Sequence, residues 1–414
     1  MWGRGHSPRP PMHPARTTLC YSDAVNTPLY RRTILLVALM VVVPGLLHAA
    51  PAPRDLTITA DDGASLKATY YPAAGPGPAV LLLHMCNTDR RSWAPLGVQL
   101  ADAGIHAFAL DYRGFGESAG KAFTTLAPAE ATQLVRKAWP ADIDHAFRTL
   151  LDQPGVDPAR IGVAGGSCGV AQAAGVARRH PEVRAMVLLA GPIGTDGRHF
   201  ILDNPWMPIF ASAAADDQYD NDAPQAMRWL TELGGNPRNK FVGFADGKHG
   251  TEIFGPHPEL PRAIVSWLKD VLVTSVPSPD KPTTPVQTPA HEFWALVYRG
   301  DVTKATEYAA AARSRDPKVF LFPEADMNFA GYEQLQAGNA KAAVALFKMN
   351  VEAYPTSANA QDSLGDGYVA DGQPALALQA AEKCLSMLDG YHADEQTKAA
   401  IRQSAEDKIK KLKP

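Results

Sequence analysis

The chain is poor in cysteine and in net charge, and both deficits exclude classes of protein. Its 414 residues include 4 cysteines, and the formal net charge at pH 7 is −3. So few thiols exclude a small disulfide-stapled scaffold, and no Cys/His spacing typical of a zinc site occurs. The near-neutral charge gives no reason to expect nucleic acid as a partner. We also expect no metal or organic cofactor.

Long apolar runs are scarce, and the most prominent one lies near the N-terminus. Arg31 and Arg32 precede an apolar run that is followed by small residues. This order is typical of a secretory signal, and the run is shorter than the ~20 residues of a membrane span. We predict an N-terminal segment over 1–49 with a signal peptide at 31–49 and cleavage after Ala49. The protein would then be periplasmic or secreted, without a membrane span; an uncleaved anchor is the alternative.

Short apolar runs alternate with helix-like segments over about half of the chain. Continuous apolar runs such as residues 79–83 are expected of strands buried on both faces, and amphipathic stretches lie between them. This alternation specifies an α/β fold with a doubly wound, mostly parallel sheet and helices on both of its faces. The expected strands cover 56–59, 66–71, 79–83, 106–110, 161–164, 185–190, 209–213 and 241–244.

A proline-rich stretch separates this region from a helical one. Residues 274–290 combine prolines with Ser and Thr and show no apolar period, which is typical of an extended linker. Beyond it, two alanine-rich segments, 331–354 and 365–388, repeat with a period of about 34 residues, which resembles the tetratricopeptide repeat. We predict an α/β domain over 50–273 and a small all-α repeat domain over 291–414, whose candidate partner is a protein or a peptide.

One serine between glycines indicates the chemistry. The segment from Gly165 to Gly169 reads Gly-Gly-Ser-Cys-Gly, follows an apolar strand and precedes a helix-like stretch, which is the G-x-S-x-G pattern of a nucleophile elbow. The turn is so sharp that the backbone at Ser167 is strained. Side chains at the two outer glycines would collide with the adjoining strand and helix. The pattern predicts that the Ser167 hydroxyl projects above the sheet.

An activated serine needs a base, an orienting acid and donors for the oxyanion. The loops after two later strands carry Asp216-Asp217 and His249. The order serine, acid, histidine, each on a strand-end loop, favours His249 as the general base. It leaves either adjacent aspartate as the acid, with Asp220 and Asp222 as more distant candidates.

Four motifs together resemble the α/β-hydrolase superfamily, particularly its lidless, dienelactone-hydrolase-like members. They are residues 83–86, a D-x-R-G-x-G-x-S stretch at 111–118, the elbow, and Lys-His-Gly at 248–250. The resemblance covers about half of the chain and implies Ser167 as nucleophile and a catalytic histidine at position 249. Alignment of Pro208 with the proline that commonly opens the seventh strand of the family places the acid at Asp217.

The resemblance also implies an oxyanion hole made of two backbone N–H groups. One donor is the residue after the nucleophile, Cys168. The other comes from the loop after the third strand, where the family usually has His-Gly and this chain has His84-Met85; we predict Cys86, with Met85 as the alternative. Cys168 is disfavoured as nucleophile, because Val170 would then stand where the elbow needs a small residue. A disulfide between Cys86 and Cys168 is not expected, because it would distort the hole.

The predicted function is that of an exported serine hydrolase. It would cleave a small or medium carboxylic ester or a lactone through an acyl-enzyme on Ser167. Only residues 191–207 separate the sixth expected strand from the seventh, which is too few for a helical lid, while the insert 119–140 can overhang the pocket. Two alternatives stay open: a peptidase of the dipeptidyl-peptidase-like type on the same fold, and a non-catalytic binding protein that works through the helical repeats.

Overall fold

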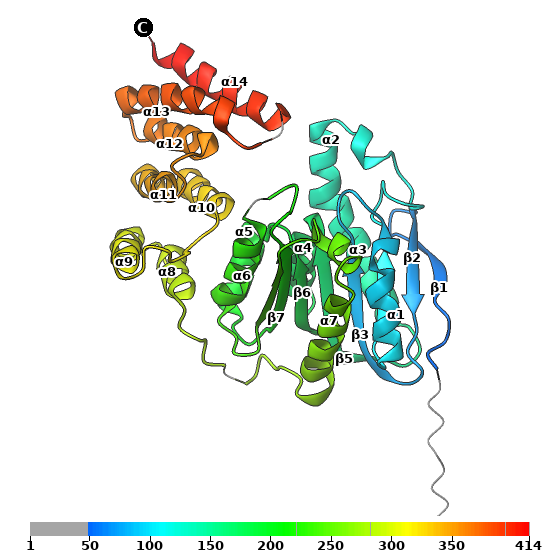
Figure 1. Cartoon of the computed structure of the whole chain (residues 1–414). Helices are drawn as coiled ribbons and strands as arrows, with labels where there is room; N and C mark the ends of the chain where they lie inside the picture. Colours follow the sequence, from blue (N-terminus) through cyan, green and yellow to red (C-terminus); the bar gives the residue numbers. More distant parts are fainter. Residues whose placement is uncertain (1–48, 221, 282, 394, 414) are drawn as a thin grey trace, which may run out of the picture. The chain divides into compact units, whose positions relative to one another are not determined.

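A computed structural model describes residues 49–220, 222–281, 283–393 and 395–413 of the chain (Figure 1). The predicted signal peptide lies outside the described residues except for its last position, Ala49. No helix within the described ranges is long and apolar enough to cross a membrane.

An eight-stranded sheet forms the centre of the first half of the chain (Figure 1). Its first two strands form an antiparallel hairpin, the second strand pairs antiparallel with the fourth, and all other neighbours are parallel. The predicted fold class is therefore confirmed. In sheet order the strands are β1 (Arg54–Thr59), β2 (Ser65–Tyr71), β4 (His106–Leu110), β3 (Gly77–Leu83), β5 (Val156–Gly166), β6 (Val183–Leu189), β7 (Ile209–Ala214) and β8 (Lys240–Phe244).

Helices cover both faces of this sheet, as continuous apolar strands require. Successive β3 side chains point to opposite faces: Leu81 and Leu83 belong to one hydrophobic core, and Val80 and Leu82 belong to the other. The first core also contains residues of α3, α4 and α6, and the second contains residues of α1 and α7. The bounds are α1 (Ala94–Asp102), α3 (Trp139–Leu151), α4 (Cys168–Arg179), α6 (Ala223–Gly234) and α7 (Glu259–Lys269).

Two connections between the strands bear on the predicted pocket. The insert after β4 contains a short helix, α2 (Pro128–Gln133), before α3 begins. Its Phe123 packs on Trp139 with ring centroids 5.2 Å apart, so these aromatic side chains contribute to packing. Between β6 and β7 lies one helix, α5 (Gly194–Asp203), which contacts α4 and α10 (Glu324–Gln336).

The C-terminal region is all helical and is built from helix pairs. Its helices pack in the sequential pairs α8–α9, α10–α11 and α12–α13, and α14 packs on α13. Gly331 lies where two paired helices approach closely, since an added Cβ there would stand 2.3 Å from the Phe347 ring. The two predicted repeat segments fall on the second and third pairs; their tetratricopeptide nature stays a prediction. The bounds are α8 (Pro289–Tyr298), α9 (Val302–Arg315), α11 (Ala340–Ala353), α12 (Ala358–Ala370), α13 (Pro374–Met387) and α14 (Glu395–Leu412).

The first helices after the predicted linker pack directly on the α/β region. Trp229 of α6 and Trp294 of α8 lie with ring centroids 5.6 Å apart, and both indole N–H groups donate to the Leu321 carbonyl at 3.0 Å. The buried Arg198 of α5 pairs with Asp326 of α10 at 3.2 Å. One hydrophobic core therefore continues from the sheet into the helical region.

Candidate active site

Ser167 occupies a strained turn between β5 and α4. Its φ of 53° and ψ of −125° lie in a region that residues with a side chain rarely adopt. An added Cβ at Gly165 would stand 2.1 Å from the Gly169 carbonyl oxygen, and one at Gly169 would stand 2.5 Å from the Leu83 carbonyl oxygen. Both contacts are prohibitively short, so only glycine fits two residues before and two residues after Ser167, as the elbow pattern predicts.

Backbone strain is concentrated around this serine. Within the described ranges, the non-glycine residues with positive φ are Ser167, Ala190 at 42° and Lys248 at 61°. Ala190 directly follows β6, which neighbours β5, and Lys248 directly precedes His249. An added Cβ at Gly191 would stand 2.2 Å from the Ser167 carbonyl oxygen. Unfavourable backbone conformations of this kind gather at functional sites, where the surrounding structure holds them in place.

His249 meets a carboxylate on the neighbouring strand-end loop. Its Nδ1 lies 2.7 Å from Asp217 Oδ2, and both side chains are buried. The second carboxylate oxygen of Asp217 accepts the N–H groups of Tyr219 at 2.9 Å and Asp220 at 3.2 Å. Because the carboxylate can only accept, Nδ1 carries the proton in this pair, and Nε2 keeps the lone pair that a general base uses.

The other predicted acids point elsewhere. Asp216 accepts the backbone N–H of Lys248 at 2.8 Å and so braces the histidine loop rather than the imidazole. Asp220 accepts the N–H of Asp222 at 2.9 Å, and burial raises the pKa of the Asp220 carboxyl. Among the four aspartates considered, Asp217 is the one whose carboxylate contacts His249.

Met85 and the Leu189 carbonyl both contact the elbow and the histidine loop. Ser167 N donates to Leu189 O at 2.9 Å, and an added Cβ at Gly250 would stand 3.7 Å from that same oxygen. Added Cβ atoms at Gly166 and Gly250 would stand 3.2 Å and 2.3 Å from atoms of the buried Met85 side chain. The Ser167 turn and the His249 loop are therefore close neighbours. Sequence reasoning considered Met85 only as an oxyanion donor and missed this packing role.

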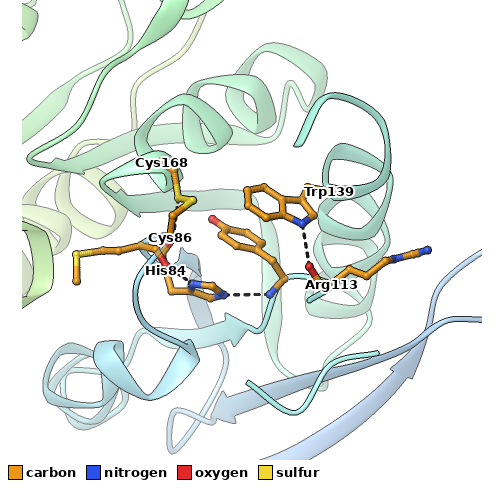
Figure 2. The surroundings of a disulfide bond; sticks show 7 residues. His84, Cys86, Arg113, Trp139 and Cys168 are labelled. Atoms are coloured by element: carbon orange, nitrogen blue, oxygen red, sulfur yellow. Dashed lines mark hydrogen bonds between the residues drawn. A yellow bond between two sulfur atoms is a disulfide. The ribbon is translucent and has the colours of Figure 1, made fainter. Parts of the chain in front are cut away.

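The two predicted oxyanion donors are covalently joined. Cys86 and Cys168 form a disulfide with 5.9 Å between their Cα atoms (Figure 2). The expectation that they would stay apart is wrong, because Gly169 lets the first turn of α4 approach the carbonyls of Leu83 and His84. Cys168 is the first residue of α4, so its N–H has no partner within the helix. The Cys86 N–H makes no hydrogen bond to any described residue.

His84 holds the loop that carries Met85 and Cys86. Its Nδ1–H donates to Met85 O at 2.6 Å, and its Nε2 accepts the Tyr112 N–H at 3.1 Å, as the dashed lines in Figure 2 indicate. Burial lowers the pKa of the His84 imidazole to about 4, so the ring is neutral at neutral pH. The loop is thus fixed by a neutral histidine that is hydrogen-bonded through both nitrogens.

Acid weakens the fold through His84. The ordinary pKa of 6.5 applies to the unfolded chain, so between pH 6.5 and about 4 the unfolded state binds a proton that the folded state does not. The neutral His84 therefore contributes to the free energy of unfolding. This contribution is fully present above pH 6.5, and about 3 kcal/mol of it is lost by pH 4. Urea unfolding of the wild type and of His84→Asn should show the two free energies converging by about that amount from pH 7 to pH 4. A constant difference between the two free energies of unfolding from pH 7 to pH 4 would contradict the lowered pKa of His84.

Known proteins resemble parts of this chain. Residues 75–222 match the family model described as "Serine aminopeptidase, S33". The chain is 34% identical to the uncharacterized protein Rv2307c of Mycobacterium tuberculosis over 169 residues. This segment covers 40% of this chain and 55% of that protein. The matched segment thus spans about half the length of the curated relatives that it matches.

Similar solved structures include an esterase and a protein with ferulic acid bound. The esterase Pf2001 of Pyrococcus furiosus is 18% identical, with a TM-score of 0.42 over 53% of this chain and 91% of that chain. Est1E from Butyrivibrio proteoclasticus, solved with ferulic acid bound, is 15% identical, with a TM-score of 0.43 over 53% of this chain and all of that chain. The strand order and the elbow define the class: the chain has the α/β-hydrolase fold, followed by an all-α C-terminal segment.

Proposed function

We propose that this chain is a serine hydrolase that cleaves a small or medium carboxylic ester or a lactone. The observation that carries the proposal is the buried His249–Asp217 pair at 2.7 Å, on loops next to the strained Ser167 turn. A nucleophile, a base and an acid that orients the base are the requirements of acyl transfer through a covalent intermediate.

The proposed reaction has two halves. His249 Nε2 takes the proton of the Ser167 hydroxyl while Oγ attacks the ester carbonyl carbon, and Asp217 orients the imidazole throughout. The N–H groups of Cys168 and Cys86 stabilise the oxyanion of the tetrahedral intermediate. The intermediate collapses, the C–O bond to the alcohol breaks, and His249 gives its proton to that alcohol. His249 then deprotonates a water molecule, which attacks the acyl group and releases the acid, while the proton returns to Ser167.

The openness of the site favours small substrates of this kind. Ser167 is half-buried, and Tyr219, whose ring packs edge-on against His249 with centroids 4.7 Å apart, is 65% exposed. The connection between β6 and β7, which is too short for a helical lid, contains only helix α5 among the described helices, and this helix packs on α4 and α10. A peptidase remains the second candidate, because the matching family model is described as a serine aminopeptidase.

A substrate panel separates the candidates. Nitrophenyl esters of acetate to octanoate are compared with aminoacyl nitroanilides, using the oxidised protein and Ser167→Ala as the inactive control. We expect kcat/KM for the best ester to exceed that for the best nitroanilide by at least about 100-fold, because the proposed site has no role for a free amine. Equal or faster cleavage of the nitroanilides would favour the peptidase, and turnover of neither class would favour the non-catalytic reading.

We also propose that the protein is exported and that its helical region is a tetratricopeptide-like module for a protein or peptide partner. The basic and apolar pattern before Ala50 supports export. A disulfide at the site is also consistent with an oxidising compartment. Intact-mass measurement of the secreted or periplasmic protein should give a chain that begins at Ala50. A mass that retains Arg31 would overturn this cleavage site.

A further inference from the structure

The disulfide is the direct link between the loop after β3 and the start of α4. Cys86 lies in the loop after β3, and 82 positions along the chain separate it from Cys168. In the described part of the chain, Cys86 makes no hydrogen bond through its N–H or C=O, whereas Met85 O accepts from both Thr88 N and His84 Nδ1. The hydrogen bonds to Met85 O orient the Met85–Cys86 peptide group from within the loop. The bond to Cys168 ties that peptide group to the start of α4.

The other end of the disulfide is firmly anchored. Cys168 opens α4, whose side chains are largely buried, and Ser167 N immediately before it donates to Leu189 O at 2.9 Å. Gly169 immediately after it is wedged against Leu83 O. Because these contacts hold the start of α4, the disulfide places Cys86 at a defined distance from the first turn of that helix.

The wall on the far side of the loop is also rigid. The His84 ring lies 4.1 Å from the Tyr112 ring, and Tyr112 stacks on Trp139 at 4.6 Å. Figure 2 places His84 and Trp139 around the disulfide. Cys86 and Cys168 are themselves only partly buried.

We propose that the Cys86–Cys168 disulfide positions the oxyanion hole, so that the enzyme reaches its full rate only while this bond is intact. The proposal rests on the proposed function, since it concerns the two N–H donors of that reaction. The cysteine side chains act as positioning groups: they touch no substrate, and they set the distance between the Cys168 N–H and the Cys86 N–H. A loosened Cys86 leaves the transition state with one well-placed donor and one mobile donor.

Reduction by a phosphine breaks the link without other reagents. The phosphorus atom attacks one sulfur, the S–S bond breaks, and the second sulfur leaves as a thiolate that takes up a proton. Water then supplies the oxygen of the phosphine oxide and the proton of the first thiol. The products are two thiols and one phosphine oxide.

Ester hydrolysis by the oxidised and the phosphine-reduced wild type tests the proposal. Loss of one oxyanion donor costs about 100- to 1000-fold in kcat, so a loosened donor should lower kcat by about 10- to 100-fold. KM should change less than about 3-fold, because the hole stabilises the oxyanion and not the bound ester. Reoxidation should restore kcat. If the disulfide is purely structural, its reduction will lower the melting temperature and leave kcat at 25 °C unchanged. That result would overturn the proposal.

Two variants control the experiment. Cys86→Ala/Cys168→Ala keeps both backbone N–H groups, should match the slow rate of the reduced wild type and should not respond to phosphine. Cys384→Ala removes the buried free thiol and should behave as the wild type in both states. Labelling by a fluorophosphonate separates two failures. If the oxidised protein takes no label, the proposed function is wrong; if it takes label at the same rate before and after reduction, only the role of the disulfide is wrong.

Discussion

Replacement of Ser167 or of His249 by alanine is expected to lower kcat by about 10⁶-fold. The serine hydroxyl is a poor nucleophile without a base, and the imidazole has no reaction to serve without the hydroxyl. The two residues therefore act as a unit, and the double variant should be no slower than either single variant. Steady-state kinetics on the best ester of the substrate panel, with circular dichroism to verify folding, measures this.

The chain offers a matched control for His249. His257 also contacts acids, with Nε2 at 3.1 Å from Asp246 and Nδ1 at 2.9 Å from Glu259, but it does not contact Asp217. We expect His257→Ala to change kcat by less than about 3-fold, as is usual for a side chain outside the reaction path. Equal losses in His257→Ala and His249→Ala, or losses that add in the double variant, would contradict the assignment of His249 as base.

Replacement of Asp217 by asparagine is expected to lower kcat by about 10⁴-fold. The amide has nearly the shape of the carboxylate, and its oxygen is needed to accept the N–H groups of Tyr219 and Asp220. Its NH₂ group then faces His249 and cannot accept the Nδ1–H. The imidazole then loses both its tautomer preference and the negative charge that stabilises its protonated form. Comparison of kcat for the wild type and for Asp217→Asn, with fluorophosphonate labelling rates as a second measurement, gives the size of the effect.

The adjacent Asp216 is a control for the assignment of Asp217 as the acid that orients His249. Its carboxylate accepts only the Lys248 N–H at 2.8 Å among the hydrogen bonds of the described residues, and an asparagine oxygen can accept that bond equally well. We expect Asp216→Asn to keep kcat within about 10-fold of the wild type. A larger loss in Asp216→Asn than in Asp217→Asn would mean that the acid has been assigned to the wrong neighbour.

Local patterns made the sheet and the elbow predictable. Apolar runs such as residues 79–83 specify strands buried on both faces, and the glycines around Ser167 follow from a backbone that has no room for Cβ. The edges were less predictable. Strand β5 begins at Val156, about five residues before its apolar run, because Val156 pairs with Gly77 across the sheet.

Contacts between distant segments were not predictable from the sequence. Three widely spaced cysteines follow the predicted cleavage site, and this number gave no sign of pairing. The bond between Cys86 and Cys168 depends on how closely Gly169 lets α4 approach the loop after β3. The packing of Met85 against the His249 loop is also a contact between distant segments. The glycines at 166 and 250 are a signal in the sequence that a large side chain fits beside them.

The contact between the α/β region and the helical region was also missed. The proline-rich stretch predicted an extended linker and gave no sign that Trp294 packs on Trp229 or that Arg198 pairs with Asp326. The sequence of the helical region shows where its helices pair with each other, because small residues recur at a fixed period. The sequence of the helical region contains no comparable signal for the surface of the α/β region on which it packs.

The central claim is that Ser167 is a nucleophile activated by His249, and labelling with a fluorophosphonate tests it most directly. The folded, oxidised wild type should gain the mass of one phosphonyl group, and peptide mapping should locate that group on Ser167. Ser167→Ala should gain none, and His249→Ala should react much more slowly than the wild type. A folded, oxidised wild type that takes no label, or takes it on another residue, would contradict the account.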